Sequence, residues 1–284
     1  MNRIAQVLAE LHAAIDGKLP LVLAGGYGLY LKQQRLLDTD ERTLFPRKDW
    51  PIPRTTEDID LLLHAEVATD SSRMSELRGA LDSMGFEPID TARYYQFVRN
   101  DEYGMVKIDL LAGPLGKHES RVRSDPRRVR PRPSVNLHAR RTPEAIGVEE
   151  ESISITVEEA NGVEVLIPNA LTFVLMKLGA LSDRANDEEK DFGRHHALDL
   201  YRCVAMLTPG EDESASRIRD RHAGHEATQT GLEQVEALFG TAESIGRIRL
   251  LEHSLLPEAA DVDRFVVELR HLVVGSTQKG GHGR

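Results

Sequence analysis

The spacing of hydrophobic and polar positions predicts alternating helices and strands over the first 111 residues of the chain. Apolar residues recur at helical spacing over residues 3–15, 27–35 and 70–84. Short apolar or alternating runs predict strands over residues 21–24, 58–64, 94–98 and 105–111. This order of elements is typical of a small α/β domain built on a mixed sheet.

Beyond these elements the pattern changes from strands to helices. Two alternating runs, 152–157 and 162–167, flank a turn at Ala160-Asn161-Gly162 and predict a β-hairpin. Helical spacing then predicts helices over residues 171–181, 196–207, 213–240, 242–254 and 258–274. We therefore expect an α+β fold, whose parts are an N-terminal domain over 1–168, a helical domain over 169–275 and a disordered tail over 276–284.

The composition, 40% hydrophobic and 29% charged, is that of an ordinary globular protein. No apolar run is long enough to span a bilayer, and the N-terminus lacks the pattern of a signal peptide. We therefore expect a cytoplasmic protein without a membrane partner. The single cysteine, Cys203, excludes an internal disulfide and a zinc site built on cysteines, and its apolar helical context predicts a buried thiol.

Charge is distributed unevenly along the chain. The net charge of −10 argues against a protein that coats nucleic acid without specificity. Residues 117–141, however, hold nine Lys or Arg and only two acids, a balance that is compatible with a partner bearing phosphates. Residues 117–133 show no periodicity, so they form either a solvated loop or an arm that faces nucleic acid.

Three aspartates are expected on neighbouring strands. Asp58 and Asp60 alternate with apolar residues, so their side chains lie on one side of a strand. Asp109 lies between Ile108 and Leu110 on a later strand, where an unpaired acid is costly to bury. Carboxylates that are brought together are commonly balanced by a divalent cation. The three acids therefore predict a site for Mg²⁺ (or Mn²⁺) that supports phosphoryl transfer from a nucleoside triphosphate (NTP).

Further residues suit the phosphates of such a substrate. Gly25 and Gly26 stand between a strand and a helix, where backbone amides can face an anion; the alternative is a plain tight turn. Arg54, Thr56 and Lys177 are candidates to offset the remaining phosphate charge. Lys177 lies in the middle of an apolar helix, so it either reaches solvent or points at a negative group.

In this order the motifs resemble those of the polymerase-β-like nucleotidyltransferase superfamily, whose pattern is a glycine turn, an acid-x-acid strand and a later third acid. Within it the chain looks most like the abortive-infection (AbiEii-type) toxins, which join a nucleotidyltransferase domain to a helical domain that begins with a lysine helix. The matching segments are Ala24-Gly25-Gly26, 55–61, 167–168 with 176–180, and 197–201. They cover about residues 18–207.

The resemblance implies roles for individual residues. Asp58 and Asp60 would bind metal, Asp60 and Lys177 would act in catalysis with Lys177 on the nucleotide phosphates, and an aspartate on the following helix would complete the site. That aspartate is Asp199 by its Asp-Leu context or Asp191 by its Lys-Asp context, and we prefer Asp199. The chain departs from the pattern in the long 36–54 loop and in His196, which stands where an aspartate is expected.

Three functions remain open at this point. The first is transfer of a nucleoside monophosphate (NMP) to RNA, such as a tRNA end, by the toxin of a toxin–antitoxin or phage-defence system with a cognate antitoxin. Residues 117–141 would then guide the RNA backbone. The second is modification of a small molecule or a protein hydroxyl. The third is a degenerate, non-catalytic nucleotide-binding partner.

Overall fold

The computed structural model describes residues 3–53, 56–102 and 104–275. The chain forms two compact units. The first comprises the residues up to Thr39 together with Pro53–Pro168, and the second comprises Asp40–Ile52 together with the residues from Asn169 onward. The disordered tail expected over 276–284 lies outside the described residues, as does Arg54.

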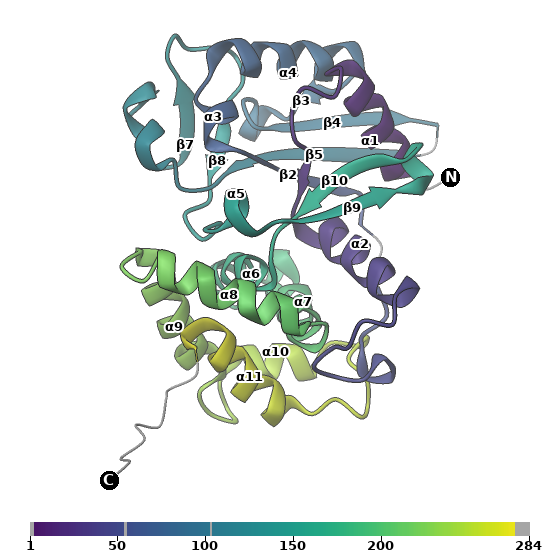
Figure 1. The fold of residues 1–284 in the computed structure, drawn as a ribbon, viewed down its shortest axis with the longest axis vertical. Helices are drawn as coiled ribbons and strands as arrows, with labels where there is room; N and C mark the ends of the chain where they lie inside the picture. Colours follow the sequence, from purple (N-terminus) through teal and green to yellow (C-terminus); the bar gives the residue numbers. More distant parts are fainter. Residues whose placement is uncertain (1–2, 54–55, 103, 276–284) are drawn as a thin grey trace. The chain divides into compact units, whose positions relative to one another are not determined.

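The first unit is built on a mixed β-sheet (Figure 1). Its main path runs in the order β6-β7-β8-β5-β2-β1-β10-β9, with β4 pairing β5 and β3 pairing β4. The strands are β1 (Val22–Leu23), β2 (Asp58–Leu63), β3 (Glu87–Pro88), β4 (Gln96–Asp101), β5 (Gly104–Ala112), β6 (Val122–Arg123), β7 (Arg128–Pro131), β8 (Ala139–Arg141), β9 (Ile153–Val157) and β10 (Val163–Ile167).

Alternation along the central strands separates an apolar face from a polar face. β2 runs parallel to β5 and antiparallel to β1. Ile59, Leu61, Ile108 and Leu110 point to the same side of the sheet and are buried. Helices α1 (Arg3–Ala14) and α4 (Ser71–Ser83) lie along one side of this sheet, and α2 (Gly25–Asp38) lies along the other (Figure 1).

Local signals explain where the remaining elements of the first unit begin. The side chain of Asp70 caps α4 by accepting hydrogen bonds from the amides of Ser72 and Arg73. The antiparallel pair β9 and β10 confirms the predicted hairpin. The short helices are α3 (Ala65–Ala68), α5 (Val148–Glu151), η2 (Asp90–Ala92), η3 (Gly116–Arg121) and η4 (Glu158–Ala160).

The basic segment 117–141 differs from its prediction. It contains part of η3 and the strands β6, β7 and β8, so the expected lack of regular structure over 117–133 is wrong. Whether this segment faces nucleic acid stays a prediction. Val122 and Val129 are buried beneath these strands. Two isolated valines among arginines and prolines are a weak alternation signal, and pairing with β5 supplies the order that local sequence does not.

The second unit is helical. Its elements are η1 (Arg47–Asp49), α6 (Ala170–Arg184), η5 (Glu188–Gly193), α7 (Arg194–Ala205), α8 (Pro209–Arg221), α9 (Glu226–Phe239), α10 (Ile245–Leu251) and α11 (Val262–Val274). The single helix expected over 213–240 is wrong, because α8 ends before the His222–His225 segment and α9 begins after it. Cys203 is buried in α7, as predicted.

Residues 40–52, which we call the strap, pack with these helices. The amide of Leu44 donates to the carbonyl of Leu207, and the amide of Phe45 donates to that of Ala205. Trp50 is buried and donates from Nε1 to the carbonyl of Phe45. The strap is therefore an ordered part of the second unit, although its sequence is typical of a mobile loop.

The predicted fold class is confirmed: the chain is α+β, with a mixed sheet in its first part and helices in its last. None of the helices within the described residues combines the length and apolar character required to cross a membrane.

Candidate functional site

The register of the central strands brings two predicted acids side by side. Asp60 on β2 and Asp109 on β5 are direct partners in the parallel ladder, so their side chains share the polar face. Asp58, two residues before Asp60, lies on the same face and is paired in register with Lys107. Asp58 is exposed, whereas Asp60 and Asp109 are half-buried. We call Asp58, Asp60 and Asp109 the carboxylate cluster.

Asp109 has one occupied and one unoccupied carboxylate oxygen. Its Oδ2 accepts a hydrogen bond of 2.9 Å from Nε2 of Gln96 and another of 2.9 Å from Nζ of Lys107. Its Oδ1 is buried and has no hydrogen-bond partner. Burial raises the pKa of Asp109 and the charge of Asp58 raises it further, while Lys107 and Gln96 act in the opposite direction. A buried carboxylate oxygen without a hydrogen-bond partner, such as Oδ1 of Asp109, is suited to bind a cation.

The predicted glycine turn borders the cluster. Gly25 and Gly26 form the first turn of α2, where backbone amides have no acceptor within the helix. Gly25 has φ +62°, and a Cβ atom at this position would stand 1.8 Å from Oδ2 of Asp60. Any side chain here would therefore displace the Asp60 carboxylate, so glycine is required for both the backbone conformation and the close approach.

The loop before β2 holds the other predicted phosphate contacts. Oγ1 of Thr56 accepts a hydrogen bond of 3.2 Å from the amide of Asp58, so the hydroxyl fixes the start of the acidic strand. Arg54 lies outside the described residues. The nucleotide-binding roles of both residues stay predictions.

The residues present fit a hard divalent cation in part. Oxygen ligands suit Mg²⁺ and Mn²⁺, and the free Oδ1 of Asp109 beside Asp60 offers such a ligand. In the part of the chain that the structure describes, His, Cys, Asp and Glu side chains nowhere gather in a group of three or more that could hold a metal ion. The assignment of Asp58, Asp60 and Asp109 as metal ligands stays a prediction. Of the three, Asp60 and Asp109 are direct neighbours in the sheet.

The second unit contains a different arrangement of charges. Nζ of Lys177 on α6 lies 2.7 Å from Oδ2 of Asp199 on α7, and Nη1 of Arg202 lies 3.1 Å from Oδ1 of Asp199. The Asp199 side chain is 0% exposed and those of Lys177 and Arg202 are 7% and 1% exposed. We call these three residues the buried ion triad. It pairs the two predicted residues Lys177 and Asp199. Because the Asp199 side chain is fully buried, a ligand cannot reach its carboxylate directly.

Two histidines and one alternative aspartate surround α7. His196 is buried and contacts Nη1 of Arg184 through Nε2. Burial lowers the pKa of His196 far below its usual range, and the charge of Lys177 lowers it further, so the ring is neutral. Asp191 is exposed and forms an ion pair with Arg194. Between the two candidates, Asp199 is the aspartate that contacts Lys177.

Basic side chains continue the polar face of the sheet from β5 toward β6. Leu111, which shares a face with Asp109, is the register partner of Arg140, and Arg140 is the partner of Arg128. Arg130 is in turn the partner of Arg123. We call Arg140, Arg128, Arg130 and Arg123 the arginine ladder. Because register partners point the same way, the ladder lies on the face that carries the carboxylate cluster.

Only part of this basic surface is free to bind a ligand. Arg128 and Arg130 form ion pairs with Asp125, and Arg141 forms one with Glu119. Arg123, Arg127 and Arg140 are exposed and have no ion-pair partner among the described residues. The free positive charge therefore includes these last three and excludes the arginines that Asp125 and Glu119 already bind.

Sequence reasoning missed three residues that contact predicted ones. Lys107 shares the alternation of Asp109 two residues later, so its place on the same strand face was visible in the pattern. Arg202 follows Asp199 by three residues, a spacing that brings helix side chains together. Gln96 reaches Asp109 only through the pairing of β4 with β5, which no local signal specifies.

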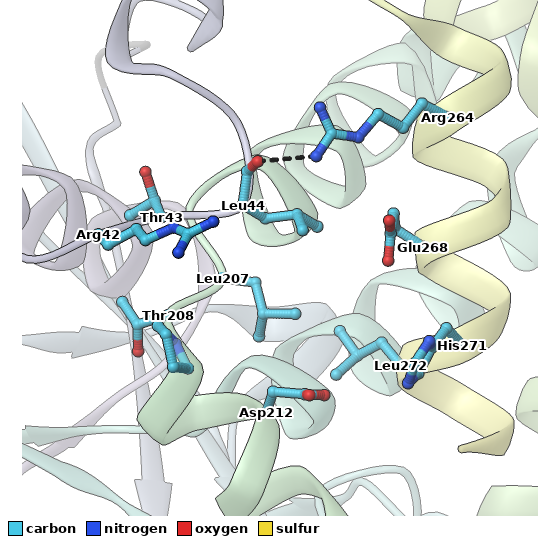
Figure 2. A pocket seen from close by; sticks show the side chains of 11 residues that line it. Arg42, Thr43, Leu44, Leu207, Thr208, Asp212, Arg264, Glu268, His271 and Leu272 are labelled. Atoms are coloured by element: carbon cyan, nitrogen blue, oxygen red, sulfur yellow. Dashed lines mark hydrogen bonds between the residues drawn. The ribbon is translucent and has the colours of Figure 1, made fainter. Parts of the chain in front are cut away.

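A separate cavity of about 280 Å³ lies within the second unit, between the strap, α8 and α11 (Figure 2). Leu44, Leu207 and Leu272 give it an apolar lining, and charged side chains of both signs complete it. Nη2 of Arg264 donates to the carbonyl of Leu44 and so ties the strap to α11. None of the predicted site residues that the structure describes lines this cavity.

Comparison with known proteins gives two similarities. A family model described as nucleotidyltransferase matches residues 51–215, more than half of the chain. Among solved structures, the solution structure of the antibiotic-resistance factor ANT(2'')-Ia has 15% sequence identity and a TM-score of 0.37, with 80% of this chain and 97% of that chain covered. The comparison with curated proteins gives no match. The matched range 51–215 contains the carboxylate cluster and the buried ion triad but not Gly25 and Gly26.

Proposed function

The chain belongs to this nucleotidyltransferase family, and on that premise we propose that it moves an NMP from an NTP to an acceptor hydroxyl. In this reaction the acceptor oxygen bonds to the α-phosphorus, the bond to pyrophosphate breaks and the hydroxyl proton is lost. The observation that carries the proposal is the register pair Asp60–Asp109 with its unoccupied, buried Oδ1.

Each predicted residue has a role in the proposal. Asp58, Asp60 and Asp109 hold Mg²⁺ or Mn²⁺, which supplies charge stabilisation for the triphosphate when bound. The α2 amides at Gly25 and Gly26 face a phosphate, and Thr56 and Arg54 are assigned by sequence to offset its charge. Lys177 offsets phosphate charge. Asp199 acts through Lys177 by holding its ammonium, and so it is a positioning residue.

For the acceptor we propose RNA, such as a tRNA end, modified by the toxin of a toxin–antitoxin or phage-defence system. Support comes from the arginine ladder, which extends the face of the carboxylate cluster with positive charge on a protein of net charge −10. A phosphate backbone that follows this face would meet Arg140 and Arg123 in turn. A cognate antitoxin is the expected protein partner.

The first test is a transfer screen with labelled NTPs and Mg²⁺ against total RNA, total protein and small hydroxyl compounds. We expect label in RNA with the wild-type protein and at least a roughly thousandfold loss with Asp58→Ala. Glu87→Ala, an exposed acid on β3, is the matched control and should keep full activity. Full transfer by Asp58→Ala would disprove the mechanism, and label in protein or small molecules instead of RNA would disprove the acceptor.

The second test separates acceptor binding from nucleotide binding. Combined Arg123→Glu, Arg127→Glu and Arg140→Glu substitutions should raise the KM for RNA about tenfold or more and flatten its salt dependence. The Kd for Mg²⁺–NTP, measured by calorimetry, should stay within about twofold of the wild-type value. Arg128 and Arg130 are avoided because Asp125 already binds them. An unchanged KM for RNA would contradict the role of this face.

A further inference from the structure

Lys107 places a positive charge inside the carboxylate cluster. It stands two residues before Asp109 on β5, on the same strand face, and its Nζ lies 2.9 Å from Oδ2 of Asp109. In register it is the direct partner of Asp58. Its side chain is 22% exposed, so the ammonium is partly shielded from water rather than solvated at the surface.

The cluster and Lys107 together have a charge that suits one divalent cation. Three carboxylates and one ammonium carry a formal charge of −2. Lys107 and Gln96 both use Oδ2 of Asp109, while Oδ1 remains without a hydrogen-bond partner. The ammonium therefore offsets part of the repulsion among the acids and leaves one buried oxygen available.

We propose that Lys107 is the counter-cation of the carboxylate cluster and competes with a divalent cation for Asp109. This rests on the proposed function, because it takes the cluster as the metal platform. Lys107 stabilises the acids while no metal is bound and weakens the binding of the metal alone. Tight metal binding then requires the extra phosphate oxygens of an NTP, so metal and nucleotide enter the site together.

An aligning role and a purely structural role of Lys107 each predict a different change in metal affinity. If Lys107 served to hold Asp109 in a metal-binding conformation, its removal would weaken metal binding. If it served only to fasten β5, its removal would lower stability and leave the metal affinity unchanged. The metal affinity measured without nucleotide distinguishes these three roles, because removal of Lys107 would strengthen, weaken or leave unchanged the binding of the metal. This measurement does not depend on activity.

The experiment is a calorimetric titration of Mn²⁺ into the full chain in the absence of NTP. Lys107→Met should lower the Kd for Mn²⁺ about tenfold, because a like charge close to the ion is removed. Lys107→Arg, which keeps the charge, should stay within about twofold of wild type. Lys117→Met removes one exposed positive charge from the same unit without touching an acid, and it should also leave the Kd unchanged.

Thermal unfolding supplies the second readout. Without metal, Lys107→Met should unfold at a lower temperature than wild type, and saturating Mn²⁺ should reduce this difference. Lys107→Gln replaces Lys107→Met if the latter does not fold. An unchanged or raised Kd for Mn²⁺ in the variant overturns the role of Lys107 alone. Absence of Mn²⁺ binding, without and with a non-hydrolysable NTP, in wild type and variant overturns the metal platform of the proposed function.

Discussion

The carboxylate cluster of the first unit and the buried ion triad of the second unit are both groups of charges, but they are closed to different degrees. In the cluster, Asp58 is exposed and Oδ1 of Asp109 has no hydrogen-bond partner. In the triad, Asp199 is 0% exposed and each of its oxygens contacts a cation. The cluster carries excess negative charge that a ligand can neutralise, whereas the triad neutralises its own aspartate.

The degree of closure decides which charged residues can bind a ligand directly. A fully buried carboxylate held by two cations would lose both partners if it turned to a ligand, at a cost of several kcal/mol. A half-buried carboxylate with one vacant oxygen gains a partner when a cation arrives. We infer that Asp60 and Asp109 act on the ligand itself, and that Asp199 acts by fixing Lys177.

The largest expected effect compares the two regions by stability. Asp199→Asn should lower the free energy of unfolding by about 3 kcal/mol, because Lys177 and Arg202 remain buried without their counter-charge. Asp60→Asn, the matched change in the cluster, should alter it by less than about 1 kcal/mol while abolishing transfer. Urea denaturation of both variants measures the difference. Equal losses of stability would mean that the cluster is as much a structural element as the triad.

An intermediate effect tests the close approach of α2 to the cluster. Gly25→Ala should reduce the transfer rate about 10- to 100-fold, because its Cβ would meet Oδ2 of Asp60 at 1.8 Å and displace the carboxylate. Gly85→Ala is the matched control, since Gly85 also has a positive φ of +76° but no heavy atom within 4 Å of the added Cβ. Equal rates in single-turnover assays of the two variants would show that the position of Asp60 does not limit the reaction.

The smallest effect concerns the response of the triad region to acid. The folded-state pKa of His196 is depressed, so its contribution to stability is present above the unfolded value of 6.5 and is lost as the pH falls below it. Wild type should lose about 1.4 kcal/mol per pH unit below 6.5 relative to His196→Gln. Unfolding free energies measured between pH 7 and pH 5 check this. Parallel curves for the two proteins would contradict a neutral, buried imidazole beside Lys177.

Elements with a strong period could be predicted from the sequence, together with the acids they carry. Alternation over 58–64 and 105–111 predicts two strands with Asp58, Asp60 and Asp109 embedded in them, and both strands are present. Nothing in a single strand, however, specifies its neighbour. The parallel register that sets Asp60 beside Asp109 arises from long-range pairing, as does the contact of Gln96 with Asp109.

Regions rich in charge and proline gave the least reliable predictions. The segment 117–141 forms strands because the end of β5, beyond its pairing with β4, is open to β8 and because Val122 and Val129 can be buried. The arginines of the segment indicate neither. The split between α8 and α9 follows from a short segment of His, Ala and Gly that interrupts an otherwise helical pattern. In the first case tertiary packing decided the outcome over local propensity, and in the second a short local break divided the helical pattern.

The strap has a consequence for how the protein is made. Leu44 and Phe45 donate hydrogen bonds to Leu207 and Ala205, residues that leave the ribosome long after the strap itself. During synthesis the strap must therefore remain without its final partners until α7 has emerged. The second unit is therefore completed only after the strands of the first unit have been synthesised. Each unit is encoded by two separate stretches of the messenger RNA.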